Sequence, residues 1–179
     1  MAALLARTYP TRAACVSEEL WQRLDALPSL ADAPAIVAFS AFRQEPELRP
    51  WLDRRLAEGR RLLLPRYNSS ASAYELVRIA SSGTDLTPGH YGILEPRADL
   101  PAESVVPPGA LWLIPGLAFT PRGLRLGRGR GFYDRLLAAH PGGVLVGLAF
   151  DCQILPDLPH SSWDIPMDWV LTPTRSMQR

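Results

Sequence analysis

The sequence predicts an α/β domain of three layers, in which helices cover both faces of a mostly parallel sheet. Short apolar segments without polar alternation are typical of strands that are buried on both faces, as in parallel sheets. These segments alternate along the chain with segments whose apolar residues recur at helical spacing. We find no internal repeat and no composition shift that would mark a boundary, so residues 1–179 are assigned to one domain.

The first part of the chain predicts two helices that flank a short strand. A helix is expected to begin at Ser17, whose hydroxyl suits an N-cap, and to end before Pro28. The apolar segment Ala35–Phe42 is expected to be a buried strand. A second helix is predicted over Glu47–Glu58, and Gly59 ends it.

The rest of the chain predicts further strands, one long connection and one more helix. The strand Arg61–Tyr67 is expected to be ended by its proline, which has no N–H for a sheet. Residues 81–108 are mostly turn residues and are expected to form a structured excursion on the surface. The remaining predicted elements are the strands Ala73–Ile79, Ala110–Phe119, Gly143–Phe150 and Trp169–Thr172, and a helix that begins at Phe132.

The composition excludes several classes of function. All 19 basic side chains are arginines, so lysine nucleophiles, Schiff bases and the P-loop lysine are excluded. Codon bias accounts for the missing lysine better than function does. A net charge of +1 argues against nucleic acid or a membrane surface as a partner. The apolar segments are also shorter than the ~18–20 residues of a membrane span.

The two cysteines, Cys15 and Cys152, lie in no metal-binding or disulfide-scaffold spacing. The apolar segment near the N-terminus is about five residues long, whereas a signal-peptide core has roughly 7–15. We therefore expect a cytoplasmic protein whose partners are small molecules. The sequence leaves the oligomeric state open, and a monomer is favoured.

A glycine-rich turn at residues 123–131 stands where a predicted strand ends and a helix begins. Backbone N–H groups at such a position bind phosphate, and ligands bind at the carboxyl ends of parallel strands. Arg125, Arg128 and Arg130 alternate with the glycines, so guanidinium groups and amides can face one anion. The alternatives are a solvated, flexible basic loop and a loop that contacts nucleic-acid bases, and the net charge disfavours the second.

The same segment, IPGLAFTPRGLRLGRGRGFYDRLL, resembles the signature of the 5-formyltetrahydrofolate cyclo-ligase family. That signature is a PG-x-AF strand followed by G-x-RLG-x-G-x-G-[FY]-YDR. SAFRQEPEL resembles the family's segment with a folate-contacting glutamate, LLLPRY its next strand, YGILEP its YGI-x-EP element and LPHSSWDIPMDWVLTPT its C-terminal pattern. These blocks occur in the family's order between Ala35 and Thr174.

The resemblance implies a reaction in which ATP drives the closure of 5-formyltetrahydrofolate to 5,10-methenyltetrahydrofolate, with Mg²⁺ as cofactor. It implies ATP binding by Arg125, Leu126, Gly127, Arg128, Gly129, Arg130, Gly131, Phe132 and Tyr133. It also implies catalytic roles for Arg128, Arg130 and Tyr133, substrate binding by Ser40, Glu45, Tyr91, Arg128 and Phe132, and metal binding by Asp134 and Asp164.

Each single residue outside the glycine turn also has a simpler explanation. Asp134 suits the dipole at the start of a helix, and Asp164 suits a turn before Pro166. Glu45 could be an exposed acid ahead of a helix, and Tyr91 could simply pack beside a glycine.

The chain departs from the family pattern in two places. The family's opening helix carries a Lys-x-x-x-Arg pair that reaches the ATP phosphates, but residues 1–34 hold no lysine. Arg7 and Arg12 are the early basic residues, and the Tyr-Pro between them disfavours a continuous helix. We therefore expect region 1–34 to be atypical or truncated. In the glycine turn, Arg130 stands where the family commonly has Gly or Lys.

Two functions stay open at this point. The first is an active cyclo-ligase, and the second is a catalytically impaired protein of the same kind that binds folate or a nucleotide without turnover.

Overall fold

Five parallel strands form the centre of an eight-stranded sheet, and antiparallel strands complete both edges. The computed structural model describes residues 13–43 and 45–179. The strand order is β12-β11-β10-β7-β1-β2-β3-β6. The bounds are Ile36–Val37 for β1, Leu62–Asn68 for β2, Ala73–Ile79 for β3, Ala102–Glu103 for β6, Leu111–Pro115 for β7, Val144–Leu148 for β10, Trp169–Leu171 for β11 and Ser176–Gln178 for β12.

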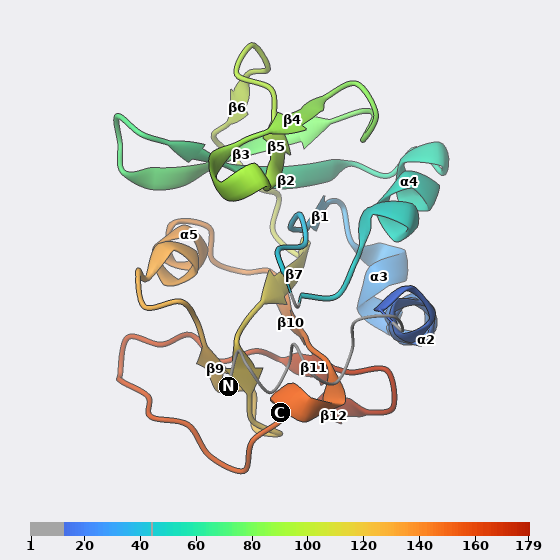
Figure 1. Cartoon of the computed structure of the whole chain (residues 1–179), viewed down its shortest axis with the longest axis vertical. Coiled ribbons are helices and arrows are strands. Elements are labelled where there is room, and N and C mark those ends of the chain that lie inside the picture. Colours follow the sequence, from blue (N-terminus) through green and yellow to red (C-terminus); the bar gives the residue numbers. More distant parts are fainter. Residues whose placement is uncertain (1–12, 44) are drawn as a thin grey trace.

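Helices cover both faces of this sheet (Figure 1). One face carries α2 (Ala13–Asp25), α3 (Pro28–Asp32) and α4 (Arg49–Ala57), and the other carries α5 (Phe132–Ala139). The predicted three-layer α/β fold with a mostly parallel sheet is therefore confirmed.

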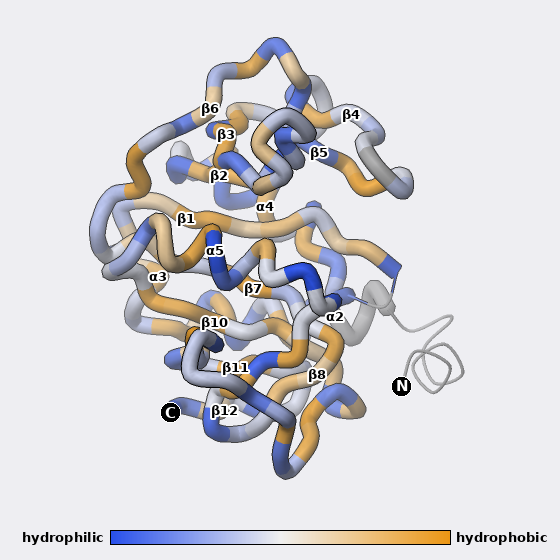
Figure 2. The backbone as a smooth tube through the Cα atoms, turned by 90° about the vertical axis from the view of Figure 1, so that its left-hand side faces the viewer, coloured by the Kyte–Doolittle hydropathy of each residue, from blue (hydrophilic) through white to orange (hydrophobic). Residues whose placement is uncertain are grey.

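The sequence of strand β7 does not alternate between polar and apolar residues, and the position of the strand in the fold explains this. All five of its residues are buried. Leu111 and Leu113 pack into the core beneath α2 and α4, whereas Trp112 and Ile114 pack into the core beneath α5. Figure 2, viewed from the side that α5 covers, shows the central strands of the sheet as mostly hydrophobic segments behind that helix. Because both faces of the strand are buried, successive residues along it are apolar.

The first helix and the first strand differ from their predicted bounds. Helix α2 already includes Ala13, so Ser17 lies inside it and is not its N-cap. The predicted strand Ala35–Phe42 pairs with its neighbours only over β1, from Ile36 to Val37. Residues that follow β1, namely Phe39, Ser40, Phe42 and Arg43, instead line a cavity. The early residues Arg7 and Arg12 lie outside the described part of the chain.

The strand after α4 passes through its proline. Pro65 lies within β2, opposite Leu76 of β3, so the prediction that it ends the strand is wrong. On its other side, β2 pairs with the parallel strand β1 only as far as Leu63. Pro65 therefore lies beyond the part of β2 that pairs with β1. The predicted strand Ala73–Ile79 is confirmed as β3.

The predicted strand Ala110–Phe119 is divided into two elements. Strand β7 ends at Pro115, and β8 (Ala118–Phe119) then pairs antiparallel with β9 (Arg125–Leu126). The predicted glycine turn is therefore partly a β-hairpin that projects from the end of β7.

Residues 81–108 form the expected structured excursion. Strand β4 (Leu86–Pro88) pairs with β5 (Leu94–Pro96), and the 3₁₀ turn η1 (His90–Gly92) connects them. A second 3₁₀ turn, η2 (Asp151–Gln153), follows β10. In the described part of the chain, no helix has the length and apolar character that a membrane crossing requires.

Candidate active site

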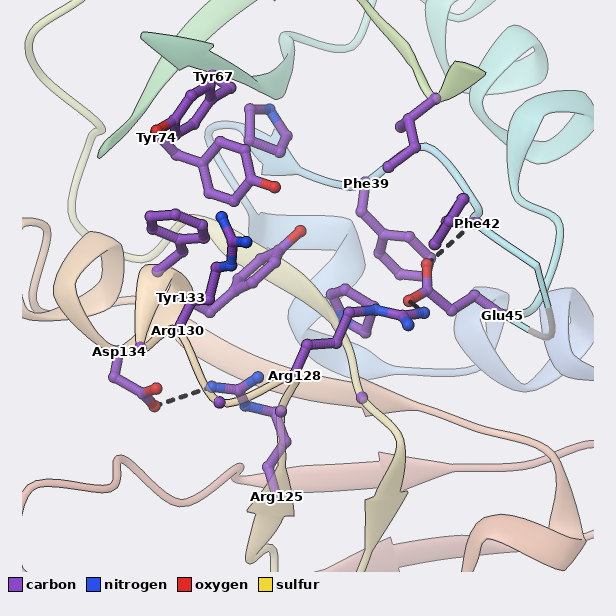
Figure 3. Close-up of a pocket in the computed structure, with 18 of the residues that line it drawn as sticks. Phe39, Phe42, Glu45, Tyr67, Tyr74, Arg125, Arg128, Arg130, Tyr133 and Asp134 are labelled. Carbon is purple, nitrogen blue, oxygen red and sulfur yellow. Dashed lines mark hydrogen bonds and ion pairs between the residues drawn. The ribbon is translucent and has the colours of Figure 1, made fainter. Parts of the chain in front are cut away.

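A cavity of about 790 Å³ opens where the parallel strands β1 and β7 end (Figure 3). From these neighbouring strands the chain continues in opposite directions across the sheet, from β1 to β2 and from β7 to β10. Such a switch point leaves a crevice at the carboxyl ends of the strands, which is where α/β folds bind ligands. Six segments line the cavity, namely residues 39–45, the β2–β3 hairpin, residues 91–95, residues 115–116 at the end of β7, residues 125–134 and residues 159–164.

Hydrogen bonds from Gln153 and Met167 hold the hairpin that carries the glycine turn. Gln153 is almost fully buried, and its side-chain amide donates to the carbonyl oxygens of Gly116 (3.0 Å) and Leu117 (3.2 Å). The N–H of Met167 donates to the carbonyl oxygen of Gly123 at 2.9 Å. The conformation of Gly123, with φ of 84°, favours glycine. These contacts attach the hairpin to two segments that are distant in sequence.

The glycine turn itself uses the conformational freedom of two glycines. Gly129 and Gly131 have φ values of 81° and 61°, in the left-handed region that other residues rarely adopt. Gly131 is the N-cap of α5, so the turn leads directly into the helix N-terminus. All residues from Arg125 to Asp134 line the cavity. This arrangement places three arginines and the N-terminus of α5 along the same cavity.

Arg125 and Asp134 form an ion pair in this part of the cavity. Arg125 Nη2 donates to Asp134 Oδ1 at 2.8 Å, and the Arg125 side chain is only 6% exposed. The Arg125 guanidinium also lies 5.6 Å from the centre of the Tyr133 ring. The buried Nε of Arg125 has no hydrogen-bond partner among the described residues. The Arg125 guanidinium is thus held in the cavity wall by Asp134 and Tyr133.

Glu45 and Arg128 form a second ion pair, between the segment after β1 and the glycine turn. Arg128 Nη2 donates to Glu45 Oε1 at 3.0 Å, and the N–H of Phe42 donates to Glu45 Oε2 at 2.9 Å. The Glu45 side chain is 10% exposed. Burial raises the pKa of the Glu45 carboxyl above its ordinary value, although the Arg128 and Phe42 hydrogen bonds oppose this rise. The Arg128 guanidinium also lies 4.9 Å from the Phe42 ring centre.

Four aromatic rings form another wall of the cavity. Tyr67 and Tyr74 are directly opposite each other on β2 and β3, and both pack edge-on against Phe132. Tyr133 contacts Tyr74, with ring centres 6.0 Å apart. The phenols of Tyr74 and Tyr133 have raised pKa values, mainly because of burial, so both stay neutral. We call these four residues the aromatic wall.

Sequence analysis missed Tyr67 and Tyr74. Both lie in predicted strands, but their pairing depends on the register of the β2–β3 hairpin, which no local motif indicates. A tyrosine near the end of one predicted strand and another near the start of the next is the signal that was available.

The other predicted site residues also line this cavity. Ser40 and Tyr91 are in the wall, and the Tyr91 ring centre lies 6.3 Å from that of Phe42. Tyr91 is 69% exposed and has a left-handed backbone with φ of 58°. Asp164 enters from the C-terminal segment, where its Oδ2 accepts the N–H of Ser161 at 2.7 Å. The structure thus brings every predicted site residue to one cavity, while their individual roles remain predictions.

Comparison with known proteins identifies relatives of this chain. A model of the 5-formyltetrahydrofolate cyclo-ligase family matches residues 1–173. The 5-formyltetrahydrofolate cyclo-ligase of Escherichia coli strain K12 is 32% identical over 157 residues, which cover 86% of this chain and 85% of that protein. The Mycolicibacterium smegmatis protein of the same name is 34% identical over 147 residues, with 79% and 75% coverage.

Solved structures show the same fold. The NMR structure of Aquifex aeolicus 5,10-methenyltetrahydrofolate synthetase superposes with a TM-score of 0.84 at 29% identity, and covers 99% of this chain and 88% of its own. A synthetase from Mycoplasma pneumoniae has the same fold, with a TM-score of 0.68 at 17% identity over 96% of this chain and 93% of its own. This chain belongs to the 5-formyltetrahydrofolate cyclo-ligase family.

Proposed function

We infer that this protein is a 5-formyltetrahydrofolate cyclo-ligase, which uses ATP to convert 5-formyltetrahydrofolate to 5,10-methenyltetrahydrofolate, ADP and phosphate. The match of residues 1–173 to the family carries this inference. The cavity supports it because phosphate-binding groups and candidate folate-binding groups face one space of about 790 Å³.

The chemistry explains why both kinds of group are needed. The formyl oxygen is a poor leaving group, so it first attacks the γ-phosphorus of ATP and ADP departs. The folate N10 then attacks the activated formyl carbon, the carbon–oxygen bond breaks, and phosphate leaves with the oxygen. N10 loses its proton in this step. No covalent bond to the protein forms, so positioning and charge stabilisation are what the cavity must supply.

We assign phosphate binding to the glycine turn. Its amides, together with Arg128 and Arg130, would hold the phosphate oxygens, whose charge is spread over the transferring group in the transition state. Arg125 would contribute the positive charge of its guanidinium in the cavity wall, with Leu126 beside it. Tyr133 would act as a neutral hydrogen-bond donor, because burial keeps its pKa well above the ordinary value.

We assign folate binding to the opposite side of the cavity. Glu45 would accept hydrogen bonds from the N–H groups of the folate ring, with Ser40 beside it. Tyr91 would close the pocket from the β4–β5 excursion. The aromatic wall, which includes Phe132, would contact the flat rings of the substrate.

The residues present fit a magnesium ion, which prefers one or two carboxylates together with phosphate oxygens and water. Asp134 and Asp164 both line the cavity, and the contacts described above engage one oxygen of each carboxylate. In the described part of the chain, no cluster of three or more metal-binding side chains offers another site. We propose that these two aspartates hold Mg²⁺, which when bound would neutralise charge on the ATP phosphates.

The experiment that tests the function follows the absorbance of methenyltetrahydrofolate. Purified protein with 5-formyltetrahydrofolate and Mg-ATP should give an increase that requires ATP. No increase at high protein concentration, with binding of folate or nucleotide retained, would instead support the impaired binding protein. A cytoplasmic monomer also remains our proposal, and sedimentation analysis tests the monomer.

A further inference from the structure

The Glu45–Arg128 ion pair connects two sides of the cavity that the proposed function assigns to different ligands. Glu45 comes from the segment after β1, on the proposed folate side, and Arg128 from the glycine turn, on the proposed phosphate side. The two residues are 83 positions apart in the chain. Figure 3 shows the Arg128 side chain extended towards Glu45.

In the ligand-free protein this pair satisfies a carboxylate that is costly to bury. Glu45 is largely buried, and burial raises its pKa, whereas the hydrogen bond and charge of Arg128 work in the opposite direction. Without Arg128, the contact that the structure shows for the carboxylate is the N–H of Phe42. The Arg128 side chain is itself 45% exposed, so its loss would leave the largely buried Glu45 carboxylate without its charged partner.

Each proposed ligand competes for one member of this pair. A phosphate bound at the glycine turn attracts the Arg128 guanidinium and repels the Glu45 carboxylate, so it weakens the contact between them. A folate ring offers Glu45 a flat edge with two neighbouring N–H donors, which is the same donor pattern that a guanidinium offers. Folate bound at Glu45 would therefore displace Arg128, and the released guanidinium would become available to phosphate.

We propose that Arg128 couples nucleotide binding to folate binding by exchanging Glu45 for phosphate. Whichever ligand binds first must weaken the ion pair between Glu45 and Arg128. The second ligand then binds to a protein in which this pair is already broken. Each ligand therefore increases the affinity for the other by the same factor, as thermodynamic linkage requires. This inference rests on the proposed function, because it uses the assignment of Glu45 to folate and Arg128 to phosphate.

Calorimetric titration of the full chain measures this coupling. The ligands are 5-formyltetrahydrofolate and a non-hydrolysable ATP analogue with Mg²⁺, each titrated alone and in the presence of the other. We expect each dissociation constant to fall at least about fivefold when the other ligand is bound. Independent binding in a protein that turns over would overturn the coupling and leave the proposed function standing. A protein that binds neither ligand would overturn both.

The Glu45→Gln variant gives the sharpest result. It removes the charge that holds Arg128, so the nucleotide should bind more tightly in the absence of folate, and the coupling factor should fall to about one. A purely structural role for Glu45 predicts no gain in nucleotide affinity. The matched control is Glu95→Gln, which removes another carboxylate from the cavity wall and leaves the pair intact. An equal gain in both variants would show a general charge effect and overturn the proposal.

The Arg128→Gln variant tests the other member of the pair. Its nucleotide affinity should fall because a phosphate contact is lost, and its coupling factor should also fall to about one. Thermal unfolding of each variant establishes that it is folded. Wild-type coupling in a folded Arg128→Gln protein would overturn the proposal, even if Glu45→Gln fails to fold.

Discussion

Arg125 and Asp134 are joined by a 2.8 Å ion pair in the wall of the cavity, where the predicted metal ligand contacts a largely buried arginine. The hairpin strand β9 supplies the arginine and the first turn of α5 supplies the aspartate. The glycine turn between them reverses the chain, so residues nine positions apart meet. Asp134 thus has a counterion before any metal ion binds, and Arg125 has a partner before any phosphate binds.

Asp134→Asn should reduce turnover by about two orders of magnitude, the usual effect of removing one charge-stabilising group. The fold should persist, because the asparagine oxygen can still accept a hydrogen bond from Arg125. The methenyltetrahydrofolate assay measures turnover, and the stabilisation of the protein against heat by Mg-ATP reports metal binding separately. Asp157→Asn is the matched control, because that carboxylate is 72% exposed. Unchanged turnover and unchanged Mg-ATP stabilisation in Asp134→Asn would remove the metal assignment.

Gly123→Ala should destabilise the protein and displace the hairpin that carries Arg125. A Cβ atom at this position would stand 2.2 Å from the carbonyl oxygen of Met167, which is backbone and has little freedom to move. Gly59→Ala is the control, because Gly59 also has a positive φ of 76° but has nothing within 4 Å of the added atom. Chemical denaturation should show a loss of about 1–2 kcal/mol for Gly59→Ala, the left-handed strain alone. Equal losses in the two variants would contradict the role of the close approach.

Gln153→Leu should lower both stability and activity, although the residue lies outside the cavity lining. The substitution leaves the carbonyl oxygens of Gly116 and Leu117 and the N–H of Phe150 without the partner they have now. Each unsatisfied buried group costs about 1–3 kcal/mol, so denaturation should show a loss of at least about 2 kcal/mol. The exposed Gln178→Leu should leave both properties near the wild-type values. A stable Gln153→Leu protein would show that the hairpin is held by other contacts.

Local sequence patterns predicted the parts of the fold that local physics determines. The apolar run of β7 and the glycines of the turn before α5 each express a requirement of their own segment, namely burial on both faces and left-handed backbone. The segment after β1 was assigned to the strand because its residues are apolar, but Phe39 and Phe42 are needed in the cavity wall. Composition alone does not distinguish these two uses of an apolar residue.

The parts of the site that the sequence did not predict depend on contacts between distant segments. The Tyr67–Tyr74 pair requires the hairpin register, and the role of Gln153 requires β7 and β10 to be neighbours. Glu45 could be selected because the surrounding residues resemble a family motif. The motif of the glycine turn likewise selected Arg128, but its pairing with Glu45 could not be predicted, because the two residues are 83 positions apart in the chain.

Asp151 should make a contribution to stability that disappears at low pH. Its carboxylate follows β10 and accepts hydrogen bonds from Thr172, Thr174 and Arg175, at 2.7, 2.6 and 3.1 Å, in the segment after β11. Burial acts to raise the pKa of Asp151, but these hydrogen bonds outweigh it and hold the pKa below the ordinary value. The folded state therefore favours the ionised form more than the unfolded state does, and the resulting stability is present above the unfolded pKa of about 3.9.

The variant Asp151→Asn should consequently be less stable than wild type at pH 7, by about 1–3 kcal/mol, because it loses charged hydrogen bonds. The difference should narrow as the pH falls through the unfolded pKa towards the lower folded pKa, because wild-type Asp151 then becomes protonated as well. Urea denaturation of both proteins between pH 7 and pH 3.5 measures this difference. Asp157→Asn, at an exposed carboxylate, should show little difference from wild type across the range. The difference in unfolding free energy between Asp151→Asn and wild type could instead stay constant with pH. That result would mean that the charge of Asp151 does not stabilise the fold and that the side chain acts through its shape alone.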